Sequence, residues 1–150
     1  MKVSLKATYG IMAIVDLALQ NGSAPVQSKA IARRKGIPVR FLGQVLHAMK
    51  QAGLIDSHRG AQGGYILGKI PSAISLAEIV EALDGPLTMP KEPKATYRRG
   101  SGRTPFDSLL HDIWAQVRQA ELGVLSAITL KDLIDRHQQF EQDRALMYHI

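Results

Sequence analysis

The stretch from Gly36 to Leu67, GIPVRFLGQVLHAMKQAGLIDSHRGAQGGYIL, predicts a tight turn, an amphipathic helix and two short strands joined by a glycine-rich loop. Gly36 is suited to end one helix, and Pro38 presets the backbone angle for the first turn of the next. Gly53 marks the end of that second helix. This order of elements is that of a winged helix-turn-helix.

The predicted helix between Pro38 and Gly53 has two different faces. Its apolar residues recur every three or four positions and predict a buried stripe of Phe41, Leu42, Val45, Leu46 and Met49. The opposite face carries side chains that can reach base edges or phosphates, namely Arg40, Gln44, His47, Lys50 and Gln51. Their type and spacing are those of a recognition helix that lies in a major groove.

A hairpin wing is predicted directly after this helix. Strands at residues 54–56 and 64–67 leave Arg59 at the start of a tip in which Gly60, Gly63 and Gly64 permit positive φ and close backbone approach. An arginine there is suited to a narrow, electronegative minor groove. The alternative is a plain hairpin with a solvated arginine. A nucleotide-binding loop is not predicted, because the P-loop pattern and the helix that must follow it are both missing.

Four segments carry a resemblance to a known family. They are the opening MKVSLKATYG, the turn Gly36-Ile37-Pro38, the segment Gly53-Leu54-Ile55 and the wing RGAQGGYIL. They resemble the Rrf family of bacterial transcription regulators along the whole chain. The resemblance implies a homodimeric repressor that binds a palindromic site in double-stranded DNA. It also implies that Arg40 and Gln44 read bases, with Val39 and Phe41 near the groove floor.

Three lysines are candidates for contacts with the DNA backbone. Lys2 and Lys6 lie at the amino end of a helix predicted from Ser4 to Gln20, where free N–H groups and positive charge attract phosphate. Lys29 lies on a short helix predicted from Gln27 to Lys35. On that helix Lys29, Arg33, Arg34 and Lys35 are expected to face outward. Interaction with the helix dipole is the alternative reason for this positive charge.

For Phe41, the alternative to a contact with DNA is a core position beneath the recognition helix.

The charge distribution supports a nucleic-acid partner. The chain has 150 residues and a formal net charge of +6. Residues 1–60 hold nine Lys or Arg against two acids, whereas residues 61–150 hold ten against eleven. The positive excess therefore lies in the predicted DNA-binding half, as an electrostatic footprint on phosphate requires. The opening residues lack a secretory signal, and no apolar run is long enough to span a membrane, so a cytoplasmic location is expected.

The second half of the chain predicts a dimerisation element. A helix capped by Ser75 and Glu78 is followed by residues 85–105, which we expect to form a flexible basic loop. A long helix then starts near Pro105, with a dimerisation seam of Phe106, Leu110, Ile113, Trp114, Val117 and Val124. Another amphipathic segment starts at Thr129, and the polar tail from Gln138 is expected to fray.

The predicted fold class is mainly α with a small β wing, a winged helix-turn-helix domain followed by a long C-terminal dimerisation helix. The predicted division is a DNA-binding domain at 1–84, a flexible loop at 85–105 and a dimerisation part at 106–150. One compact core is enough for a chain of 150 residues.

No cofactor is expected. Cluster-binding members of the Rrf family hold an iron–sulfur cluster with three cysteines in the loop before the long helix, and this chain has no cysteine. By the resemblance, Ser108 stands at the last cysteine position and His111 at that of a histidine ligand. With Asp107 and Asp112 nearby, His111 could join a divalent-metal site. We favour instead an imidazole at the surface or a dimer interface, hydrogen-bonded to a carboxylate, and predict no metal site.

An enzyme is not predicted, because the thiol nucleophile, the Gly-x-Ser-x-Gly elbow and the His-Glu-x-x-His pair are all missing. Two alternatives for control of the regulator stay open. One is a partner protein, since some family members respond to a partner enzyme, with residues 91–103 as the docking segment. The other is a small-molecule or metal sensor that uses the loop 85–105 and His111.

Overall fold

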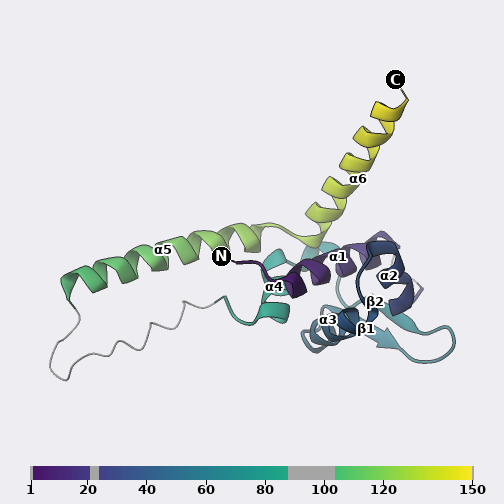
Figure 1. Cartoon of the computed structure of the whole chain (residues 1–150), viewed down its shortest axis with the longest axis horizontal. Coiled ribbons are helices and arrows are strands. Elements are labelled where there is room, and N and C mark those ends of the chain that lie inside the picture. Colours follow the sequence, from purple (N-terminus) through teal and green to yellow (C-terminus); the bar gives the residue numbers. More distant parts are fainter. Residues whose placement is uncertain (1, 21–23, 88–103, 150) are drawn as a thin grey trace.

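The computed structural model describes residues 2–20, 24–87 and 104–149. The helices are α1 (Leu5–Leu19), α2 (Ser28–Lys35), α3 (Val39–Gln51), α4 (Leu76–Asp84), α5 (Pro105–Ala127) and α6 (Leu130–Tyr148), with a short 3₁₀ turn η1 at Pro71–Ala73. The strands β1 (Ile55–His58) and β2 (Gly64–Leu67) form one antiparallel hairpin. Helices α1 to α4 and the hairpin gather into a compact part, from which α5 and α6 project (Figure 1). The predicted fold class is confirmed.

Helix α1 is the centre of the compact part and packs against α2, α3 and α4. It starts after Ser4, whose Oγ accepts a hydrogen bond from the Ala7 N–H, so this predicted terminal residue is the cap. Gly36, with a φ of 64°, ends α2 in the left-handed conformation that glycine adopts without strain. The turn and α3 follow as predicted, and the helix-turn-helix is complete.

The wing is tied to the segment before α2. Val26 and Tyr65 exchange two backbone hydrogen bonds, of 2.9 Å and 2.8 Å, outside the regular strands. Gly64 makes this contact possible, because a Cβ at that position would lie 2.5 Å from the Val26 carbonyl. The first strand starts one residue later than predicted and continues to His58, where it pairs with Gly64. The hairpin is therefore held against the start of α2.

One ion pair lies at the edge of the core. Asp16 is 2% exposed, although its neighbours on α1 are apolar. The Arg34 guanidinium donates to it through Nη2 at 2.7 Å and through Nε at 3.0 Å. Arg34 is exposed, as predicted, and its guanidinium also pairs with Asp16, because a buried carboxylate needs a charged partner and Arg34 is the group that reaches it. The pair joins α1 to α2.

The start of α6 belongs to the same core as the winged part. Leu130 is fully buried and Ile134 nearly so, and both join the hydrophobic cluster that surrounds α1. Two backbone bonds fasten this junction, from the Leu76 N–H to the Ile128 carbonyl at 2.7 Å and from the Leu130 N–H to the Ile74 carbonyl at 2.8 Å. The core thus crosses the boundary between the predicted DNA-binding and dimerisation parts.

The C-terminal segment is helical where fraying was expected. Helix α6 continues to Tyr148, and its last ten residues have exposed side chains. Residues 85–87 leave α4 as predicted for the start of a loop, whereas residues 88–103, with the predicted docking segment 91–103, lie outside the described residues. No helix within the described ranges is long and apolar enough to cross a membrane.

Candidate nucleic-acid interface

The outward face of α3 presents the predicted recognition residues together. Arg40, Gln44 and His47 are all exposed and follow one another at helical spacing. The inward face consists of Leu42, Val45, Leu46 and Met49, each with no exposed area. Val39 starts the helix and is 56% exposed, so its methyl groups are available to an apolar partner such as a thymine methyl. The amphipathic pattern predicted for this helix is confirmed.

Phe41 lies between these two faces. It is half-buried, and its ring meets that of Tyr9 edge to face, with centroids 5.5 Å apart and an interplanar angle of 78°. Such aromatic pairs add about 0.5–1.5 kcal/mol beyond the burial of their area. The contact joins the start of α3 to α1, which is the core role weighed for Phe41 from the sequence.

Beside the tie of Val26 to the wing, a hollow of about 450 Å³ is lined by the wing and by the start of α2. Its polar and charged lining residues are Gln27, Ser28, Lys29, Ser57, His58, Arg59 and Tyr65, and Gly60, Gly63 and Gly64 complete it. The structure therefore brings Lys29 and Arg59, which are 30 positions apart in the sequence, to one site. The Lys50 ammonium also donates to Ser57 Oγ at 2.6 Å, which links α3 to β1.

The start of α2 adds positive potential to this hollow. Gln27 precedes the helix and makes no side-chain capping bond. The first N–H groups of a helix carry partial positive charge and favour anions. With the cations of Lys29 and Arg59 beside them, these groups make the hollow suited to a phosphate.

Two of the lysines predicted to contact the DNA backbone do not line the hollow of the wing. Lys2 lines a separate cavity between α4 and α5, together with Trp114, and the structure does not bring it to the hollow of the wing. Lys6 is half-buried in the first turn of α1.

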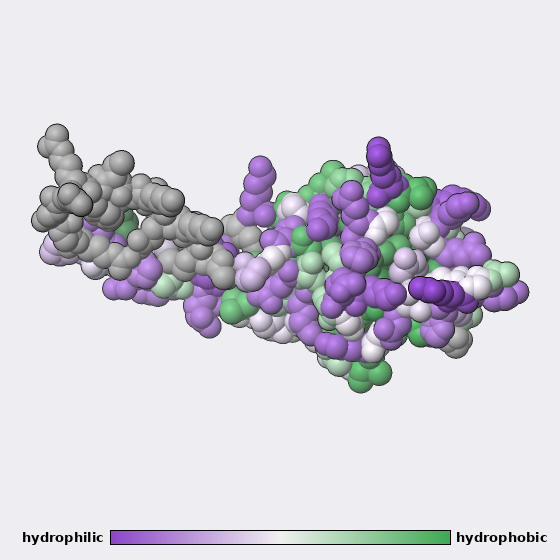
Figure 2. Space-filling model, turned by 90° about the horizontal axis from the view of Figure 1, so that it is seen from below, coloured by the Kyte–Doolittle hydropathy of each residue, from purple (hydrophilic) through white to green (hydrophobic). Residues whose placement is uncertain are grey.

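The lower side of the compact part, seen in Figure 2, is covered largely by hydrophilic residues, with small apolar areas between them.

The predicted dimerisation seam is uncovered in the single chain. Its residues are Phe106 (64% exposed), Leu110 (38%), Ile113 (43%), Trp114 (58%), Val117 (45%) and Val124 (60%). Within α5 only Leu125 is buried. A large apolar side chain gains about 1.5–3 kcal/mol when it is fully buried, so this face is suited to a protein partner.

Comparison with known proteins identifies the family. The sequence profile of the Rrf2 family, described as iron-dependent transcriptional regulators, matches residues 3–136. The chain belongs to the Rrf2 family. It is 32% identical over 150 residues to the helix-turn-helix-type transcriptional regulator CymR of Bacillus subtilis, with 99% of both chains covered. It is 31% identical over 140 residues to the regulator IscR of Klebsiella pneumoniae, with 92% of this chain and 82% of that protein covered.

Solved structures of the Rrf2 family agree with the fold. The structure of CymR, the global cysteine regulator of Bacillus subtilis, has a TM-score of 0.74 and 31% identity, and covers 91% of this chain and 98% of that one. IscR of T. potens has a TM-score of 0.72 and 36% identity, with 91% and 88% covered. The family and these relatives are transcriptional regulators, which confirms that the chain is a regulator and not an enzyme.

The residues of this Rrf2 member do not fit the iron–sulfur cluster that the family implies. The chain has no cysteine, and one imidazole cannot replace a ligand set built on thiolates. Within the described residues, no three His, Asp or Glu side chains are grouped so as to hold a metal. Asp107, considered with His111 for a metal site, has another role: its carboxylate accepts from the Thr104 N–H at 3.0 Å and from Thr104 Oγ1 at 2.7 Å. Asp107 therefore caps α5.

Some residues that shape this surface were not predicted. The Val26–Tyr65 backbone bonds and the Asp16–Arg34 ion pair join segments far apart in the sequence, and no local sequence pattern predicts them. The capping boxes Thr104–Asp107 and Thr129–Asp132 do have a local signal, a threonine followed by an acid three residues later. The same signal correctly predicted the box at Ser75 and Glu78.

Proposed function

We propose that the protein is a homodimeric repressor of transcription that binds a palindromic site in double-stranded DNA. Each protomer contacts one half of this site. The observation that carries this proposal is the position of the wing relative to α3. The exposed side chains of α3 and the tip at Arg59 belong to one rigid unit, since Lys50 links α3 to β1 and Val26 fastens the hairpin to the start of α2.

This unit suits two neighbouring grooves of B-DNA. A major groove admits an α-helix, and Arg40 and Gln44 have the chemistry to read guanine and adenine edges. The wing then reaches the adjacent minor groove, where narrow A·T-rich DNA attracts arginine. Between them, the hollow that holds Lys29 takes the intervening phosphates, and such contacts set the position of the protein without reading sequence.

The exposed seam of α5 supports a homodimer. A helix with apolar side chains at alternating spacings of four and three packs on a second helix, and a two-fold axis pairs the same seam with itself. A two-fold protein dimer matches a palindromic site, since each protomer then meets an equivalent half-site. Repression requires in addition that the site overlaps a promoter, where a bound dimer excludes the polymerase.

Selection of binding sites from a library of random duplexes tests this proposal. We expect an inverted repeat whose half-sites lie about one helical turn, or a multiple of it, apart. The variant Arg40→Ala should relax the preference at one base position in each half-site, by about 1–3 kcal/mol. Arg136→Ala, which removes an exposed cation from α6, is the matched control and should return the same motif.

Two results would contradict the proposal. If the selection recovers no motif at low salt, the proposal of sequence-specific binding is contradicted. If the motif lacks two-fold symmetry, the proposal of a homodimer on the DNA is contradicted. A transcription assay in vitro with the selected site in a promoter then tests repression, which requires that RNA synthesis falls as the protein is added.

A further inference from the structure

A glycine, Gly43, lies inside α3 on the outward face of this helix. Glycine inside a helix lowers stability relative to alanine, because it loses more backbone freedom on folding. The backbone at Gly43 is ordinary α-helix and does not have the positive φ that favours glycine. The local backbone conformation therefore does not account for this residue.

Packing within the chain does not account for Gly43 either. In the described part of the chain, a Cβ at this position would meet no atom within 4 Å beyond its two neighbours and its own helix. Gly10 of α1 is the opposite case, since a Cβ there would overlap the side chain of Leu83. Contact between helices thus explains the glycine in α1 but not the one in α3.

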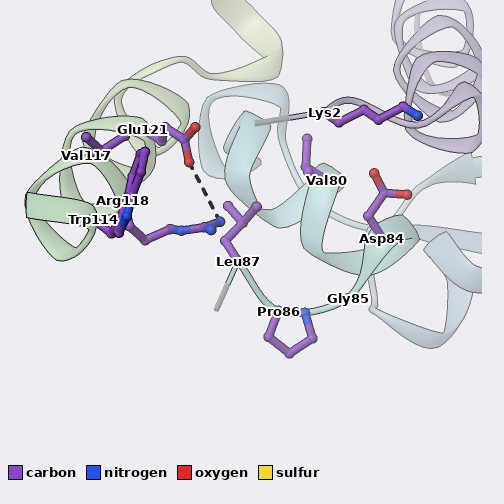
Figure 3. A pocket seen from close by; sticks show the side chains of 10 residues that line it. All are labelled: Lys2, Val80, Asp84, Gly85, Pro86, Leu87, Trp114, Val117, Arg118 and Glu121. Atoms are coloured by element: carbon purple, nitrogen blue, oxygen red, sulfur yellow. Dashed lines mark ion pairs between the residues drawn. The ribbon is translucent and has the colours of Figure 1, made fainter. Parts of the chain in front are cut away.

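Other open features of the chain lie in the proposed dimer contact. Gly123 of α5 also has open space around it, but it is next to Val124 of the seam. The cavity between α4 and α5, shown in Figure 3, is lined by Trp114 and Val117 of the same seam. In the proposed dimer a second copy of the chain packs against this seam, whereas Gly43 lies on the face that meets DNA.

The missing side chain leaves a notch on the outward face of α3. Val39 lies four residues before Gly43 and His47 four residues after it, so these two residues are its neighbours along the helix surface. The side chain of Val39 is 56% exposed. The floor of the notch is helix backbone, whose N–H and C=O groups bond within the helix. The floor therefore offers van der Waals contact and no hydrogen bond.

We propose that this notch holds the C5 methyl group of one thymine in each half-site. Among the groups that base pairs present in the major groove, the thymine methyl is the apolar one, and the others donate or accept hydrogen bonds. A methyl group suits a notch that has a backbone floor and Val39 as an apolar wall. The missing Cβ also lets the helix approach the base pairs closely, which keeps Arg40 and Gln44 within reach of their edges. This proposal rests on the proposed DNA-binding function and names one base of the site.

The first test removes the methyl group from the DNA. Each thymine of the selected site is replaced in turn by deoxyuridine, which keeps the hydrogen-bonding edge and lacks the methyl group. The replacement is made in both half-sites, and binding is measured by fluorescence anisotropy of a labelled duplex. We expect one replacement to weaken binding of the wild type by about fourfold for each half-site, or about 15-fold for the dimer.

The second test fills the notch. Gly43→Leu should raise the melting temperature by about 2–4 °C, because leucine favours a helix more than glycine does. It should nevertheless weaken binding to the selected duplex by about tenfold or more. Its binding to a scrambled duplex should stay nearly unchanged, and it should no longer distinguish thymine from deoxyuridine. The matched control is Ala73→Leu, which adds a similar side chain at an exposed position of η1 and should bind DNA as the wild type does.

Several results would overturn this contact while leaving sequence-specific binding intact. The first is a wild type that binds every deoxyuridine duplex as tightly as the thymine duplex. The others concern Gly43→Leu: it melts below the wild type, binds the selected duplex as tightly, loses equal affinity for the scrambled duplex, or still prefers thymine to deoxyuridine. A wild type that selects no motif at all instead contradicts the proposed DNA-binding function, and the thymine contact with it.

Discussion

The compact part and the arm formed by α5 use the same helical pattern with opposite outcomes. In the compact part Ile14, Leu46 and Ile79 have no exposed area, whereas Trp114 and Val124 on α5 are 58% and 60% exposed. Both regions repeat apolar residues at spacings of three and four. The comparison teaches that this pattern determines a helix and its apolar face, while the partner of that face depends on which other elements can reach it.

Polar groups show the same contrast. In the compact part, the carboxylate of Asp16 is nearly buried and held by Arg34, so the charge is part of the packing. On α5 the pair Arg118–Glu121 is partly exposed at 3.7 Å. Pairs of this kind contribute little to stability, because solvent screens the two charges. We therefore expect changes in the first region to affect the stability of the fold, and changes in the second to affect the proposed dimer.

The largest effect should come from charges placed in the seam of α5. The double variant Ile113→Asp and Val117→Asp puts two carboxylates per protomer into the proposed dimer contact, which should weaken dimerisation by more than about 4 kcal/mol. Light scattering should show a monomer at micromolar concentration, and the melting of the compact part should change little. Gln119→Asp changes the charge of an exposed residue off the seam and should remain a dimer. If the double variant also dimerises, the seam is not the interface.

Loss of the ion pair between Arg34 and the buried Asp16 should destabilise the compact part instead. Arg34→Met leaves Asp16 buried without its partner, at a cost of about 3 kcal/mol in the free energy of unfolding. Urea denaturation followed by circular dichroism measures this change. Arg33→Met removes the exposed neighbouring cation and should alter stability by less than about 0.5 kcal/mol. If the two variants have the same free energy of unfolding, the ion pair does not stabilise the fold.

The next effect distinguishes the two cations of the wing hollow. Arg59→Ala should weaken binding to the selected site by about 2 kcal/mol and reduce the preference for A·T pairs beneath the wing. Lys29→Ala should weaken all sequences alike and lower the salt slope by about one per protomer. Titrations at several salt concentrations, with the selected duplex and a scrambled one, measure both. If Arg59→Ala loses equal affinity on the two duplexes, Arg59 is only a phosphate contact.

The smallest effect concerns the cap of α4 and depends on pH. The pKa of Glu78 is lowered by hydrogen bonds from the Ser75 backbone N–H and from Lys69. The folded-state pKa is thus below the unfolded one, so this stabilisation is present above the unfolded pKa and is lost as the pH falls through the folded pKa. Glu78→Gln should lower the unfolding free energy by about 1 kcal/mol or less at neutral pH.

The matched control for this carboxylate is Glu141→Gln, which changes an exposed residue of α6. Urea denaturation of both variants and the wild type, at neutral pH and in mild acid, gives the comparison. The difference in unfolding free energy between the wild type and Glu78→Gln should become smaller in acid. Glu141→Gln should have the same unfolding free energy as the wild type at both pH values. A difference for Glu78→Gln that grows as the pH falls would contradict the assignment.

The sequence by itself determined the parts of this protein whose signals are local. The stripe and the polar face of α3, the hairpin with Gly60 to Gly64, and the start of α5 at Pro105 were all predicted, and the structure has them. These features depend on backbone preferences and on periodicity within a few residues. Boundaries were shifted by a residue or two, because caps such as Ser4 lie partly in the helix.

Only the tertiary structure decided which distant segments meet. Arg34 is exposed as expected, but its pairing with Asp16 was not predicted, since it depends on how α2 packs against α1. The tie between Val26 and Tyr65, the burial of Leu130 against the winged part and the position of Lys2 beside Trp114 likewise join residues far apart in the chain. Such contacts depend on the packing of whole elements, and the residues near each partner in the sequence contain no signal for them.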